Sequence, residues 1–228
     1  MQQSGYHAVY LEVGKHKAFA LALEWPGWCR SGKNEESALQ ALLDSAPRYK
    51  RILEPTRLFF EVPKSTTYLT ITERVQGNVS TDFGAPTISI PRDQDQPSPE
   101  EVERYKAIFQ AAWIAFDQAA QSAEGKELRK GPRGGGRELA AIIEHVAGAD
   151  LSYLNSLGWK VKTISYKDAS QHIDLIRSEV LKGIDSAAAG LLPTVGPKGA
   201  KKWTLRFFAR YATWHVVDHT WEIEDRII

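Results

Sequence analysis

The chain has 228 residues, a length that suits one large or two small domains. Hydrophobic residues make up 43% of it and charged residues 25%, a composition ordinary for a water-soluble globular protein. The net charge of +1 does not favour nucleic acid or a membrane surface as a partner, and a single cysteine, Cys29, excludes an internal disulfide and a cysteine-rich zinc module.

The sequence also indicates a cytoplasmic protein. The lone cysteine fits a reducing compartment. The N-terminus has no basic region followed by an apolar run, and no stretch approaches the roughly 18 apolar residues of a membrane span. We therefore expect neither a signal peptide nor a membrane partner.

The first part of the chain carries strand-like patterns. Residues 6–13 and 17–24 alternate between apolar and polar side chains, and Gly14-Lys15 between them is typical of a turn. Residues 58–62 and 68–73 predict two further strands.

A helix is predicted between the two pairs of strands. Asn34 suits its N-cap, Ser37 follows three residues later, and the first turn is acidic. Pro47 lies near its predicted end. Strands and helix together predict a small α+β domain over residues 1–75.

This first domain resembles the HicB-like antitoxin fold, a ferredoxin-like or double-stranded-RNA-binding-like unit. The strands, residues 26–32 (PGWCRSG) and residues 34–39 (NEESAL) carry the resemblance, over about residues 6–50. HicB antitoxins normally continue into a DNA-binding module, whereas this chain does not. The resemblance therefore implies a partner-facing or dimerising module.

Residues 76–97 are rich in turn-forming residues and predict a linker, with the domain boundary near Asp95. The composition favours a solvated linker. The alternative is a loop, formed by residues 73–77 and 81–84, that reaches over a site in the second domain.

Four helices, each with one apolar stripe, are predicted in the remainder of the chain. They cover residues 98–125, 138–156, 167–189 and 203 onward. Four helices of about twenty residues predict a four-helix bundle over residues 98–228. The predicted fold class is thus an α+β domain followed by an all-α bundle.

A basic, glycine-rich turn, residues 131–137, precedes the second of these helices. It matches neither a Walker A motif nor a dinucleotide fingerprint. A flexible interhelical loop is the favoured interpretation, and an anion cradle at the helix N-terminus is the alternative.

The fourth helix carries two histidines four residues apart, His215 and His219, which project from one helical face. Two imidazoles in that geometry can bind one metal ion, with His145 on the second helix as a third ligand. A random chain of this composition shows such a pair about once in six or seven cases, so spacing alone is not specific. The alternative is a pair of structural histidines, hydrogen-bonded to Asp218 or Glu222.

The second and fourth helices resemble the DinB-like (YfiT-like) superfamily of metal-binding bundles. The matching runs are residues 137–139 (REL), 144–146 (EHV), 150–154 (DLSYL) and 214–219 (WHVVDH). The resemblance covers about residues 98–228 and implies a metal triad of His145, His215 and His219. It also implies a homodimer and, in characterised members, a transferase that uses low-molecular-weight thiols such as mycothiol or bacillithiol.

Three neutral imidazoles leave a divalent ion with an open position for water or substrate. Zinc and nickel are the first candidates, although imidazole also suits iron and copper. Glu144, Asp218 and Glu222 are candidates for orienting the ligands. The alternative for these three acids is surface ion pairing with Arg210 and Arg226.

Two functions follow from this site. In the first, the protein is a metal-dependent thiol S-transferase or hydrolase acting on a small molecule, with no catalytic residue yet identified. In the second, it is a non-catalytic binding or regulatory protein in which the metal is structural and the HicB-like domain binds a partner or RNA. A pocket plugged by aromatics such as Trp113 or Trp214 would favour the second function.

Overall fold

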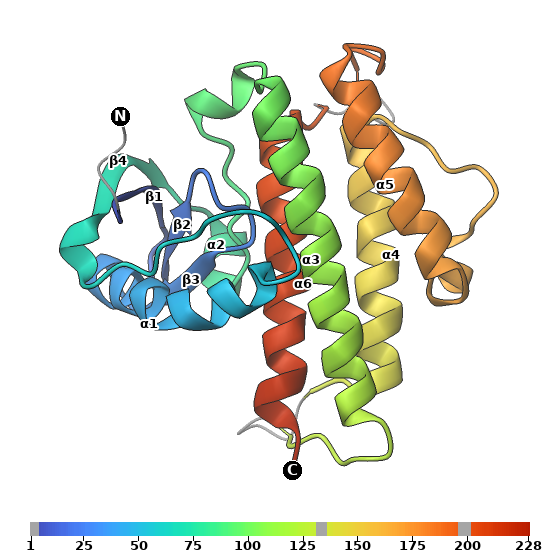
Figure 1. Cartoon of the computed structure of the whole chain (residues 1–228), viewed down its shortest axis with the longest axis horizontal. Helices are drawn as coiled ribbons and strands as arrows, with labels where there is room; N and C mark the ends of the chain where they lie inside the picture. Colours follow the sequence, from blue (N-terminus) through green and yellow to red (C-terminus); the bar gives the residue numbers. More distant parts are fainter. Residues whose placement is uncertain (1–4, 131–135, 196–201) are drawn as a thin grey trace.

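The computed structural model describes residues 5–130, 136–195 and 202–228, and Figure 1 shows a small sheet unit beside a bundle of long helices. The N-terminal unit contains β1 (His7–Val13), β2 (Ala18–Ala22), β3 (Cys29–Gly32), α1 (Glu35–Leu53), a 3₁₀ turn (Thr66–Tyr68) and β4 (Leu69–Gln76). The short helix α2 (Val79–Phe83) and a 3₁₀ turn (Pro91–Gln94) follow. The long helices are α3 (Pro99–Ala123), α4 (Leu139–Leu157), α5 (Ile173–Ala188, after a 3₁₀ turn at Tyr166–His172) and α6 (Leu205–Arg226). The layout is α+β, as predicted.

The sheet has the strand order β3-β2-β1-β4, with β1 antiparallel to β2 and parallel to β4. Both of its faces are buried. Alternate residues of β1 and β2, such as Leu11 and Ala20, belong to the core that includes α1. The intervening residues Tyr10, Phe19 and Leu21 pack in a second cluster that contains Trp214 of α6. The sheet therefore lies between α1 and α6.

The capping prediction for α1 is confirmed, since Asn34 accepts a hydrogen bond from the Ser37 backbone N–H at 2.9 Å. The prediction that the helix ends near Pro47 is wrong. α1 continues to Leu53 because Tyr49, Ile52 and Leu53 bury their side chains in the core, which outweighs the hydrogen bond that proline removes.

Two strand predictions are also wrong. Residues 58–62 form no strand, because no strand in the part of the chain that the structure describes pairs with them. Phe60 instead packs among the rings of Trp25, Trp28 and Tyr49. β3 was not predicted, because Cys29–Gly32 is short and lacks an apolar pattern. Its pairing with β2 is a tertiary contact.

Residues 76–97 are partly packed rather than wholly solvated. Glu12 of β1 is fully buried, and its carboxylate accepts hydrogen bonds from the Thr81 hydroxyl at 2.6 Å and the Ile88 backbone N–H at 3.0 Å. A buried carboxylate needs such donors. Part of this segment therefore lies along the sheet, although Val79 and Phe83 remain exposed.

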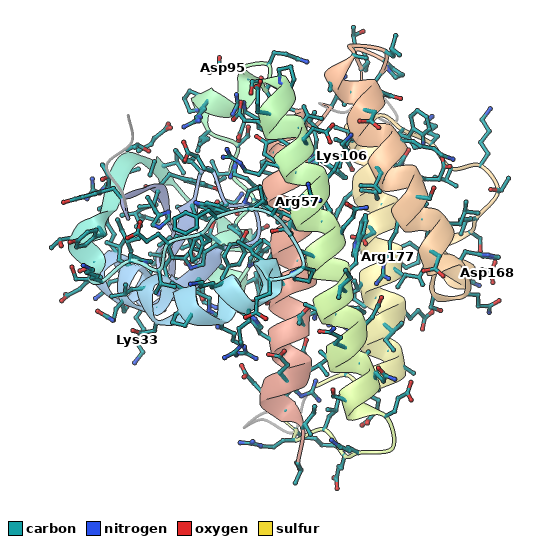
Figure 2. The ribbon with its side chains drawn as sticks, in the orientation of Figure 1. Lys33, Arg57, Asp95, Lys106, Asp168 and Arg177 are labelled. Atoms are coloured by element: carbon teal, nitrogen blue, oxygen red, sulfur yellow. The ribbon has the colours of Figure 1, made fainter. Side chains whose placement is uncertain are left out.

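The four long helices pack side by side, with α3 and α4 as the main neighbours of both α6 and α5. Arg177, labelled in Figure 2, reaches from α5 to Asp117 of α3 with two hydrogen bonds of 2.7 Å. Within the described ranges, no helix is both long and apolar enough to cross a membrane.

A buried ion pair joins the sheet unit to the bundle. Arg210 of α6 donates to Asp93 and to the Tyr10 hydroxyl of β1, and its guanidinium stands over the Tyr10 ring at 4.8 Å. Asp93 also accepts from the Ile90 backbone N–H at 2.9 Å. Arg210 and Asp93 are nearly inaccessible to solvent, so each charge depends on the other for compensation.

We expect Arg210→Met to lower the free energy of unfolding by about 3–5 kcal/mol, because it leaves the Asp93 carboxylate buried without its cation. Arg74→Met is the matched control. Arg74 pairs with Glu35 at the surface, and its loss should change stability by less than about 1 kcal/mol. Urea unfolding of both variants measures the difference, and equal losses would contradict a special role for Arg210.

Candidate metal centre

Helix α6 places His215 and His219 on the side that faces α4. The helix begins after Thr204, whose hydroxyl accepts from the Phe207 backbone N–H, and its apolar residues bury it on most sides. The two imidazole rings lie 4.5 Å apart, one helical turn from each other. His145 of α4 meets them with centroid distances of 4.9 Å to each ring. The two helices therefore bring together the three predicted histidines.

The nitrogen separations fit a shared ion. The Nε2 atoms of His145 and His215 are 3.1 Å apart, and one ligand nitrogen from each of the three rings lies within 4.8 Å of the others. Two ligands at about 2.0–2.1 Å from an ion are roughly 2.9 Å apart at a right angle and roughly 3.3 Å apart at a tetrahedral angle. The widest separation must close to below about 4.2 Å for one ion to contact all three. The 3.1 Å contact equally suits a hydrogen bond between two neutral rings.

The surroundings keep two of the imidazoles neutral. Burial, followed by the nearby His219 and Arg137, lowers the pKa of His145 to about 4. Burial also lowers the pKa of His215 well below its usual value. A neutral imidazole is the form that binds a metal, so protons do not compete at these two rings near pH 7.

Glu222 orients one of the ligands. The His219 Nδ1–H donates to a carboxylate oxygen of Glu222 at 2.6 Å, and Arg226 donates to the other oxygen at 2.7 Å. The bond from His219 is the main cause that lowers the pKa of Glu222. With its proton on Nδ1, His219 presents an unprotonated Nε2. Of the three predicted orienting acids, this one also pairs with Arg226.

The other two acids point elsewhere. Asp218 pairs with Arg30 of β3 at 3.3 Å, and Glu144 is exposed to solvent. Neither makes a hydrogen bond to the triad in the part of the chain that the structure describes. The buried Nδ1 of His215 has no hydrogen-bond partner among the described residues. Such an unpaired buried group is unfavourable and is a feature that occurs at functional sites.

The two predicted pocket tryptophans lie on different sides of the bundle. Trp214 packs between α6 and the sheet, with its ring 6.2 Å from Phe19 and 6.2 Å from His215. Trp113 of α3 packs against Phe109 at 5.4 Å and lies 5.6 Å from the guanidinium of Arg177. Among the described ring contacts, none joins Trp113 to a histidine.

Two neighbours of the triad were not predicted as site residues. The Tyr153 ring stands edge-on to His215 at 5.4 Å, and Arg137 lies close enough to the triad to lower two histidine pKa values. Helical periodicity places Tyr153 on a buried stripe, but only the packing of α4 on α6 shows which residue it meets. Residues 131–135 of the glycine-rich turn lie outside the described residues.

No family model matches the sequence, and neither a curated protein nor a solved structure matches it. The chemistry of the site therefore has to be inferred from its own residues. These are three imidazoles, one orienting carboxylate and two arginines.

We expect Glu222→Ala to weaken metal binding by about 10- to 100-fold, because His219 loses the acceptor that fixes its proton on Nδ1. Asp218→Ala is the matched control on the same helix, and it should leave affinity within about threefold, since Asp218 pairs with Arg30. Competition with a chromophoric zinc chelator measures both. Equal effects would show that Glu222 does not orient His219.

A fully buried carboxyl group follows His145 on α4. Burial raises the pKa of Asp150 to about 7, and the nearby Arg177 opposes this rise. The folded state thus binds a proton more tightly than the unfolded chain, whose pKa is 3.8. Stability linked to this group is complete below pH 3.8 and is lost as the pH rises towards 7.

We therefore expect Asp150→Asn to have a higher free energy of unfolding than the wild type. This difference should grow from pH 4 to pH 7 and reach a few kcal/mol at most. The exposed Asp174 on α5 provides the control, and Asp174→Asn should show no such growth. Melting temperatures across this pH range measure the effect. A constant difference would contradict a protonated Asp150.

Proposed function

We propose that the chain binds one divalent transition-metal ion through His145, His215 and His219 and uses it on a small-molecule substrate. The convergence of three imidazole nitrogens within 4.8 Å carries this proposal. Two of these rings have lowered pKa values, and the third is oriented by Glu222. Imidazoles of this kind fit zinc or nickel better than the hard cations that prefer oxygen ligands.

The exposure of the site supports an open coordination position. His215 and His219 are buried, while His145 is only half-buried, so solvent reaches the triad from the α4 side. Three protein ligands with room for a fourth are typical of catalytic rather than structural zinc sites. A divalent ion held there would act as a Lewis acid and would lower the pKa of a water or thiol that it coordinates.

The remaining residues define what the site accepts. Arg137 and Arg226 are cations beside the triad, and Glu222 is bonded to both His219 and Arg226. The local charge therefore favours an anionic group, such as a thiolate or a carboxylate, at the ion. This charge and the DinB-like resemblance support a thiol S-transferase, with metal-dependent hydrolysis as the related possibility.

The N-terminal unit, which we propose to be HicB-like, holds α6 in place. Its sheet packs against Trp214, and its Arg30 pairs with Asp218 on the turn between the two histidines. One face of the sheet is therefore covered by the bundle. A homodimer and a cytoplasmic location are further parts of this proposal, based on the resemblance and on the single cysteine.

Metal content of the purified protein is the first test. We expect about one zinc or nickel ion per chain in the wild type and none in His215→Ala. His172→Ala is the matched control, because His172 is exposed and lies outside the triad, and it should keep its metal. Absence of bound metal in all three proteins after zinc or nickel addition would contradict the proposal.

Melting temperatures with and without chelator separate the two functions. If the ion is catalytic and has an open position, the metal-loaded protein should melt only a few degrees above the chelated protein. This small shift is the stabilisation expected from a ligand that binds the folded state alone. Unfolding on chelation would identify a structural ion and favour the non-catalytic alternative. A cobalt-substituted protein whose visible spectrum changes on addition of a thiol would support the transferase.

A further inference from the structure

A cleft with four aromatic side chains in its lining lies next to the triad. Its volume is about 330 Å³, near the lower end of the roughly 300–1,000 Å³ usual for small-molecule sites. The residues that line it are Thr87, Ser89, Gln94, Tyr153, Lys202, Trp203, Thr204, Phe207 and Tyr211. It therefore lies between α4, the start of α6 and residues 87–94.

The aromatic walls present flat, closely packed faces. Tyr153 stacks on Trp203 at 5.3 Å, and Phe207 stacks on Tyr211 at 5.6 Å. Trp203 also meets Phe207 and Tyr211 nearly perpendicularly, at 4.9 and 5.3 Å. Rings that hold one another in this way form a preorganised surface for another ring. The volume accommodates one or two rings.

The polar lining favours a negative charge. Among the described residues that line the cleft, Lys202 is the only charged one, and the start of α6 adds the positive end of a helix dipole. A nearby carboxylate, that of Asp93, accepts from the Ser89 hydroxyl at 3.1 Å but is paired with Arg210. A cationic ligand would therefore meet like charge, whereas an anion would meet Lys202.

The cleft and the triad share a wall. Tyr211 precedes His215 by one helical turn, about 6 Å along α6. Tyr153 lines the cleft and also contacts the His215 ring at 5.4 Å. The Tyr153 and Tyr211 rings also contact each other at 5.1 Å, so these two side chains stand between the cleft and the histidines.

We propose that this cleft binds the planar, apolar body of a small ring-bearing carboxylate. The carboxylate lies towards Lys202, and the ring lies against Trp203 and Tyr153, with Tyr153 between the ring and His215 of the triad. This assignment of the substrate class rests on the proposed function in one respect, namely that the triad holds an ion. Binding of the ring-bearing anion itself does not depend on the ion.

Fluorine NMR titration of the metal-free full chain tests the ligand class. The three probes share one ring and differ in charge: 4-(trifluoromethyl)benzoate, 4-(trifluoromethyl)benzamide and 4-(trifluoromethyl)benzyltrimethylammonium. We expect the benzoate to bind about tenfold more tightly than the neutral amide, and the cation to bind most weakly. Equal binding of all three, or tightest binding of the cation, would overturn the proposal.

Variants locate the binding. Trp203→Ala should weaken benzoate binding by roughly tenfold or more, and Lys202→Gln should remove most of the preference for the anion. Lys126→Gln is the matched control, since Lys126 is exposed and lies outside the cleft. Circular dichroism confirms that each variant is folded. Unchanged binding in both cleft variants would place the probe elsewhere and overturn the proposal.

Cobalt and zinc loading test the link to the triad. The fluorine signal of bound benzoate should broaden strongly in the cobalt-loaded protein and remain sharp in the zinc-loaded protein, because paramagnetic broadening requires the probe to lie within a few helical turns of the ion. Binding without broadening would overturn the assignment of the cleft to the metal site. Failure to take up cobalt would contradict the proposed function, while the metal-free titration would still decide the ligand class of the cleft.

Discussion

The buried ion pair between Arg210 and Asp93 is the interaction on which the rest of the arrangement depends. Arg210 is on α6, Asp93 is on the segment that follows the sheet, and Tyr10 on β1 accepts the second bond. An uncompensated charge in this interior would be strongly destabilising, so the three elements have to meet in one register. That register sets the rotation of α6 about its axis. Arg210 and Trp214 face the sheet, and the row of Tyr211, His215 and His219 faces α4.

The rotation of α6 explains why the histidines converge although they belong to a largely apolar helix. His215 and His219 need polar partners, and they find them in His145, in Glu222 and, by our proposal, in a metal ion. Burial keeps His145 and His215 neutral, because a charged imidazole would be unfavourable there. A neutral imidazole is the form that can bind a metal. Arg137 and Arg226 add positive charge beside the site. The same surroundings thus remove competing protons and, by our proposal, attract an anionic substrate.

The N-terminal unit contributes to this site although it supplies no ligand. Its sheet fixes α6, and residues 87–94 close one side of the aromatic cleft. Glu12 holds that segment by accepting hydrogen bonds from the backbone of Thr87 and Ile88. The two units therefore share one active region by our proposal. A bundle without the sheet unit would have the three histidines and lack part of the wall that selects a substrate.

Sequence alone determined the features that depend on local chemistry. The helical period located α3, α4 and α6 to within a few residues, and Asn34 marked the start of α1 because its side chain satisfies a backbone N–H group nearby in the chain. The spacing of His215 and His219 placed both on one face. These inferences need no knowledge of distant residues. His145 was predicted as the third ligand, but spacing could not show that α4 lies opposite that face.

Tertiary structure decided everything that depends on residues far apart in the chain. β3 exists because β2 lies beside it, and α1 continues past Pro47 because its end is buried. Residues 58–62 form no strand because no strand of the described residues pairs with them. The pairing of Glu222 with His219 is local, because residues three apart on a helix share a face, whereas adjacent residues such as Asp218 and His219 do not. Packing decided the partner of Asp218, which is Arg30, 188 positions away. Packing also brought His145 of α4 to His215, because a contact of about 3 Å between residues distant in the chain requires the two helices to meet.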